Sequence, residues 1–72
     1  MRPWLEVYRK SAGLTSKEMA KRMGISQAGY SLIETGQRQK SLDVNTIKRI
    51  AKALGKTPAE IMEAEIQWTS AS

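Results

Sequence analysis

Apolar residues recur every three or four positions along most of the chain, which is the spacing of amphipathic helices. The clearest stripe consists of Val44, Ile47, Ile50, Ala51 and Leu54. Shorter stripes of the same period come before and after it, with polar turns between them. The first expected helix begins near residue 3. The next three cover about 16–23, 27–35 and 44–54, and the fifth begins at residue 58. The pattern therefore predicts an all-α fold, a compact bundle of five short helices.

The second and third of these helices carry the strongest end signals. Thr15 and Glu18 are spaced as a capping box, in which each side chain bonds the other's free backbone N–H. Gly24 is placed to end the second helix, and Ser26 to cap the third. Two helices joined by so short a turn cross at a steep angle, which is the geometry of a helix-turn-helix over residues 16–35.

Residues 65–69 alternate polar and apolar side chains, so a short edge strand is expected near the C-terminal end. The remaining residues of this end are expected to fray. No repeat, low-complexity run or linker interrupts the sequence. We therefore expect one domain over residues 1–65 and a tail over 66–72.

Charge is distributed unevenly along the 72 residues, whose formal net charge is +5. Residues 9–56 hold eleven basic and three acidic side chains, whereas residues 57–72 hold three glutamates and no basic side chain. A basic body with an acidic end suits a polyanion bound on one face. The alternative is a solvated basic surface without a specific partner.

The composition argues against several classes of function. Without cysteine or histidine, disulfides, the usual zinc sites and the commonest nucleophile and general base are missing. The grouped carboxylates Glu60, Glu63 and Glu65 are explained by the helix dipole and solubility. We thus expect no enzyme, no metal, no cofactor and no evident small-molecule ligand. No apolar run is long enough to span a membrane and no signal peptide is present, so a cytoplasmic, DNA-associated protein without a membrane partner is expected.

Four motifs in register resemble the lambda-repressor-like helix-turn-helix domains, the XRE/Cro family of bacterial and phage regulators. Residues 14–20 (LTSKEMA) resemble the opening of the family's second helix, and Ala20 and Gly24 have the spacing of its helix crossing and turn. Residues 33–36 (IETG) and 50–55 (IAKALG) resemble two further signatures. The resemblance covers roughly residues 4–62 and implies a helix-turn-helix DNA-binding domain.

The resemblance implies a structural pair, Arg9 and Glu34, that joins the first helix to the end of the third. Tyr30 stands where the family usually has a branched aliphatic residue, and we expect it to fill the core with its hydroxyl at the surface. Lys48, Arg49 and Lys52 are interpreted as a solvated face.

The third helix would then lie in the major groove of double-stranded DNA. The implied base-contacting residues are Gln27, Ala28, Gly29, Ser31 and Leu32. Gln27 can bond adenine at two positions, whereas Leu32 is either an incidental exposed leucine or a contact to a thymine methyl group. Because this helix has no basic residue, A·T pairs are expected beneath it. The implied contacts to the DNA backbone are Ser16, Lys17, Arg38, Lys40, Asn45 and Thr46.

A lone helix-turn-helix makes few contacts, so a homodimer is expected, with Ile61, Ile66 and Trp68 as candidate anchors. Alternatively, Ile66 and Trp68 fold back over their own core near Trp4. The function favoured by the sequence is a sequence-specific transcriptional regulator, a small Cro-like repressor on a palindromic operator. An antitoxin, a restriction-modification controller and a protein-interaction module of the same fold are the alternatives.

Overall fold

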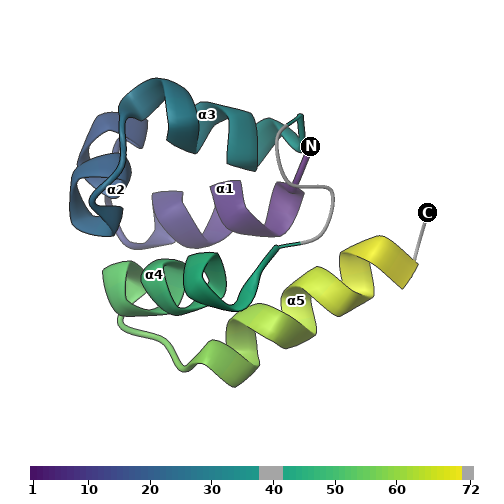
Figure 1. Ribbon diagram of the computed structural model, residues 1–72. Helices are drawn as coiled ribbons and strands as arrows, with labels where there is room; N and C mark the ends of the chain where they lie inside the picture. Colours follow the sequence, from purple (N-terminus) through teal and green to yellow (C-terminus); the bar gives the residue numbers. More distant parts are fainter. Residues whose placement is uncertain (38–41, 71–72) are drawn as a thin grey trace.

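Five helices make up the computed structural model, which describes residues 1–37 and 42–70. They are α1 (Pro3–Ser11), α2 (Ser16–Met23), α3 (Gln27–Thr35), α4 (Val44–Leu54) and α5 (Pro58–Ser70). Helix α1 lies between α3 and α5, and α2 packs against both α3 and α4 (Figure 1). The expected all-α, five-helix fold is confirmed, and the described residues contain no strand.

The helix ends follow local chemistry that the sequence already contains. Both halves of the capping box are present, with the Glu18 N–H donating to Thr15 Oγ1 at 3.1 Å and the Thr15 N–H donating to the Glu18 carboxylate at 3.0 Å. Ser26 and Asp43 cap α3 and α4 in the same way. Gly24 ends α2 at a φ of 73°, in the left-handed region that glycine enters without steric cost.

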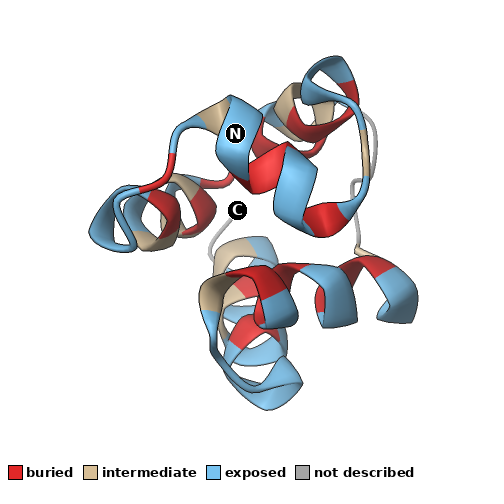
Figure 2. Cartoon of the chain, turned by 90° about the vertical axis from the view of Figure 1, so that its left-hand side faces the viewer, coloured by how far each residue is buried: buried red, intermediate tan, exposed pale blue. Residues whose placement is uncertain are grey.

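The core lies where the inward faces of the five helices meet, and Figure 2 shows these buried faces with exposed residues on the outer sides. Its fully buried apolar side chains are Leu5, Met19, Tyr30, Ile50 and Ile61. In the expected stripe on α4, Ile47, Ile50 and Ala51 are buried and Leu54 is half-buried, but Val44 at the start of the helix is 65% exposed.

The expected edge strand at residues 65–69 is wrong, because α5 continues to Ser70. Ile61, Glu65 and Trp68 are spaced four and three residues apart, so a helix places all three on one side. Ile61 and Glu65 are buried there, and Trp68 is half-buried. A five-residue alternation is too short to outweigh this burial. Helix α5 continues through residue 65 without a break. The expected division into a domain over residues 1–65 and a tail over 66–72 stays a prediction.

Arg2 joins the end of α3 to α5 and has no exposed surface. Its Nε and Nη2 donate to the Glu65 carboxylate at 3.0 and 2.9 Å, and its Nη1 donates to the Ile33 carbonyl. The Glu65 carboxylate also accepts the Leu42 N–H at 3.3 Å. The interpretation of Glu65 as a solubilising charge is therefore wrong, because its carboxylate is held inside the fold by a buried guanidinium.

Candidate nucleic-acid interface

The N-terminal turn of α3 projects two uncharged side chains into solvent. Gln27 and Ala28 are both exposed, while the Ser26 hydroxyl accepts the Gly29 N–H at 3.0 Å and fixes the start of the helix. The one charged residue of α3, Glu34, is buried. The outer face of α3 is therefore free of charge, which suits contact with base edges more than contact with phosphates.

The other implied base-contacting residues are less accessible. Ser31 and Leu32 are half-buried, and Gly29 is buried with its N–H already bonded to Ser26. Gly29 can therefore contribute close backbone approach but no free donor. Gln27 and Ala28 are the most accessible members of the set.

Arg9 and Glu34 lie together under the C-terminal half of α3. Arg9 Nε is 3.3 Å from Glu34 Oε1, and both side chains are about nine-tenths buried. Arg9 also donates through Nη1 to the Leu14 carbonyl at 2.8 Å. Burial opposes the charge of Arg9, but the charge of Glu34 and its hydrogen bond outweigh burial, so the pKa of Arg9 is raised. The pair ties α3 to α1 and takes no part in the exposed surface.

Tyr30 fills the core beneath α3, but its hydroxyl is not at the surface as expected. The side chain is 0% exposed, and its hydroxyl has no hydrogen-bond partner of normal geometry among the described residues. Burial, followed by the nearby Glu34 charge, raises the pKa of the Tyr30 hydroxyl. The hydroxyl lies beside the buried pair Arg9 and Glu34, so it faces these side chains and not water.

The residues implied to contact phosphate groups differ in how far they are exposed. Lys17 and Asn45 are exposed at the first turns of α2 and α4, and Ser16 beside Lys17 is half-buried. Thr46 is buried, and its N–H donates to Asp43 Oδ1 at 2.7 Å, so this N–H serves the cap of α4. Arg38 and Lys40 lie outside the described residues. The first N–H groups of α2, beside Lys17, have no partner within the helix and favour an anion.

Two arginines hold α2 against α4. Arg22 of α2 donates to the Ala53 carbonyl of α4 at 3.1 Å, and Arg49 of α4 donates to the Met23 carbonyl of α2 at 2.7 Å. Each guanidinium thus satisfies a carbonyl at the end of the other helix. Arg49 is exposed, as its interpretation as part of a solvated face requires, but its guanidinium is also used in this contact.

The dimer candidates on α5 occupy three different environments. Ile61 is fully buried in its own chain, Ile66 is 53% exposed, and Trp68 is half-buried with its ring 5.0 Å from the Arg2 guanidinium carbon. Of the three, Ile66 is the side chain most accessible to a second copy. Across the residues described, no helix has the length and apolar character needed to cross a membrane.

The sequence matches one family model and two curated proteins. A family model described as helix-turn-helix matches residues 5–61. The chain is 42% identical over 55 residues to an uncharacterized HTH-type transcriptional regulator of Bacillus subtilis, YqaF, covering 76% of this chain and 70% of that one. It is 37% identical over 60 residues to an uncharacterized HTH-type transcriptional regulator of Methanothermobacter thermautotrophicus, covering 83% and 84% of the two chains. No solved structure matches the chain.

Proposed function

The chain belongs to the helix-turn-helix family, and from this membership we propose that it is a small Cro-like repressor that binds a palindromic operator as a homodimer. The resemblance to XRE/Cro regulators is confirmed by the family match. Because its relatives are HTH-type transcriptional regulators, the chain is a DNA-binding regulator and not an enzyme. The repressor role, the operator and the dimer are the parts proposed here.

The observation that carries the proposal is the uncharged, exposed first turn of α3. In the proposed complex this turn enters the major groove, where the Gln27 amide bonds adenine and the Ala28 methyl group packs against a thymine methyl. Leu32, half-buried one turn further along, adds an apolar contact at the edge of this surface. With no arginine or lysine on α3, the commonest reader of guanine is missing, which favours A·T pairs beneath the helix.

The contacts to phosphate groups come from the flanks of α3. Lys17 adds a positive charge to the free N–H groups at the start of α2, and the exposed amide of Asn45 stands at the start of α4. Ser16 lies beside Lys17 at the same helix end. Arg38 and Lys40, which follow α3 in the sequence, complete the proposed set. Such contacts fix the register of the protein on the duplex but carry no sequence information.

The proposed dimer forms through the outer face of α5. Met62 and Ile66 are 46% and 53% exposed and border a hollow of about 220 Å³ that Leu42 and Ile47 also line. A two-fold axis here would let each Ile66 fill the hollow of the other copy. The longest dimension of one copy is 29 Å, so two copies can set their α3 helices about 34 Å apart, one turn of DNA. Met62 and Ile66 are the only large apolar side chains exposed on the described part of α5, so the free dimer is expected to be weak.

Selection of binding sites from random DNA tests the reading of bases. We expect an inverted repeat with A·T pairs at the positions under α3. In Gln27→Ala, discrimination at one position in each half-site is expected to fall by about 1–3 kcal/mol. Gln67→Ala removes an exposed glutamine of α5 and serves as the control. Selected sites with G·C at every contacted position would overturn the base assignments.

Sedimentation with and without operator DNA tests the dimer. Ile66→Asp is expected to abolish self-association and weaken binding to the inverted repeat, while leaving binding to a half-site unchanged. Val7→Asp is the matched control, because Val7 is 58% exposed on α1, away from the proposed interface. Equal effects of the two variants would show that α5 is not the interface.

A further inference from the structure

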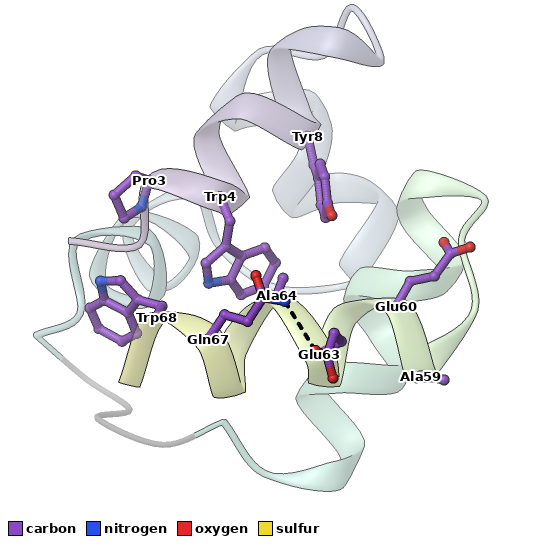
Figure 3. A pocket seen from close by; sticks show the side chains of 9 residues that line it. All are labelled: Pro3, Trp4, Tyr8, Ala59, Glu60, Glu63, Ala64, Gln67 and Trp68. Atoms are coloured by element: carbon purple, nitrogen blue, oxygen red, sulfur yellow. Dashed lines mark hydrogen bonds between the residues drawn. The ribbon is translucent and has the colours of Figure 1, made fainter. Parts of the chain in front are cut away.

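A groove of about 670 Å³ separates α1 from α5, outside the proposed DNA and dimer surfaces (Figure 3). Three of its lining residues come from α1 and six from α5, and none from α2 or α3. They are Pro3, Trp4, Tyr8, Ala59, Glu60, Glu63, Ala64, Gln67 and Trp68. Helix α5 thus presents two separate faces, because Met62 and Ile66 border the hollow beside α4 and do not line this groove.

Aromatic rings supply the walls of the groove. Trp4 and Tyr8 stand edge to face with their ring centroids 5.9 Å apart, and Trp68 closes one end from α5 (Figure 3). All three side chains are half-buried, so part of each ring remains accessible. The faces of such rings attract cations. The fold already uses this property, because Lys56 Nζ lies 4.5 Å from the Tyr8 ring centroid and the Arg2 guanidinium lies over Trp68.

Two carboxylates give the groove a charge opposite to that of the protein. Glu60 and Glu63 are exposed one turn apart on α5 and both line the groove. Within the described residues neither carboxylate forms an ion pair, and Glu63 accepts only an amide hydrogen bond from Gln67, at 3.0 Å. On a chain of net charge +5 this is an acidic site, which attracts cations.

We propose that the groove between α1 and α5 binds a small organic cation, an ammonium or guanidinium group carried on an apolar body. Its volume lies within the range of sites for small molecules. The aromatic rings would pack against the apolar body of the ligand and turn their faces toward its cationic group. Glu60 and Glu63 would balance the charge of that group. A second copy of the chain suits the site less well, because a carboxylate rim is a poor cover for an apolar interface.

The two tryptophans of the chain make the site easy to observe. Trp4 and Trp68 are its only tryptophans and both line the groove, so tryptophan fluorescence reports on this site alone. The probe is choline, and the control is 3,3-dimethyl-1-butanol, which has the same shape without the charge. In DNA-free protein we expect choline to change the fluorescence saturably with a Kd of about 1–10 mM, and the alcohol to bind at least about tenfold more weakly.

Variants on the rim test the assignment of charge. Glu60→Gln/Glu63→Gln is expected to weaken choline binding about three- to tenfold. Lys56→Gln removes a positive charge beside Tyr8 and is expected to strengthen binding about twofold. Equal binding of the neutral alcohol, or choline binding unchanged in the double glutamine variant, would overturn the proposal. Fluorescence changes that depend on protein concentration instead of choline would assign the groove to self-association and also overturn it.

These measurements contain no DNA, so their outcome is independent of the proposed repressor function. As a check, the double glutamine variant is expected to bind operator DNA like the native chain, because no residue of α3 lines the groove.

Discussion

Neutralising Glu65 tests the buried ion pair that joins the two ends of the described fold. Glu65→Gln keeps the size of the side chain and removes its charge. Arg2 keeps its positive charge with no exposed surface, facing an amide in place of a carboxylate. The three charge-assisted hydrogen bonds from Arg2 to the carboxylate, at 3.0, 3.2 and 2.9 Å, become weaker, and so does the bond from the Leu42 N–H.

The size of the effect follows from the burial of both partners. Arg2 is 0% exposed and the Glu65 side chain 8%, so breaking this pair falls in the class that costs about 3–5 kcal/mol. A domain of 72 residues has a free energy of unfolding of about 4–11 kcal/mol in total. The variant is therefore expected to lose about a quarter or more of its stability and at least about 12 °C in Tm.

Urea unfolding followed by far-UV circular dichroism measures this loss. Glu6→Gln is the matched control, because Glu6 pairs with Lys10 at 3.1 Å on the exposed face of α1. An exposed pair of this spacing contributes about 0.2–0.5 kcal/mol. The double variant Arg2→Met/Glu65→Leu removes both charges and is expected to be more stable than Glu65→Gln. If Glu65→Gln costs no more than Glu6→Gln, the reasoning from burial is refuted.

Three further predictions concern the caps, the pair under α3 and the DNA backbone. Glu34→Ala is expected to cost more than about 1 kcal/mol by removing the partner of Arg9, and an unchanged Tm would contradict this. Hydrogen bonds from the Thr15 and Thr46 backbone N–H groups lower the pKa values of Glu18 and Asp43, respectively. The stabilisation from the two ionised carboxylates is thus complete above about pH 5 and is lost as pH falls through their lowered pKa values. In Glu18→Gln/Asp43→Asn, the decrease of Tm at acid pH is therefore expected to be smaller than in the native chain. Lys17→Gln is expected to reduce the slope of log affinity against log salt by about 0.9, and an unchanged slope would exclude a phosphate contact.

The helix ends could be predicted because the chemistry that fixes them is local. Thr15 and Glu18 are three residues apart, and each needs only the other to form the capping box. The outward direction of Gln27 and Ala28 followed from Tyr30 and Ile33, whose spacing sets the inward face of α3. The exposed part of the candidate interface was predictable for the same reason.

The features that were missed depend on residues far apart in the sequence. Arg2 and Glu65 are separated by 63 positions, and nothing near either one indicates a partner. Thr46 looked accessible at the start of α4, but the packing of α4 buries it. The groove beside α5 was foreseen only in the alternative that brings Trp68 near Trp4, because its walls come from opposite ends of the chain and meet only after folding.

The exchange of arginines between α2 and α4 has a consequence for how the fold opens. The Arg22 contact spans 31 positions and the Arg49 contact spans 26, and each satisfies a carbonyl at the end of the opposite helix. If α2 frays at its last turn, the Ala53 carbonyl and the Arg49 guanidinium of α4 both lose their partners. The two helices are therefore joined into one cooperative unit, and native-state hydrogen exchange should give their slowest amides the same opening free energy.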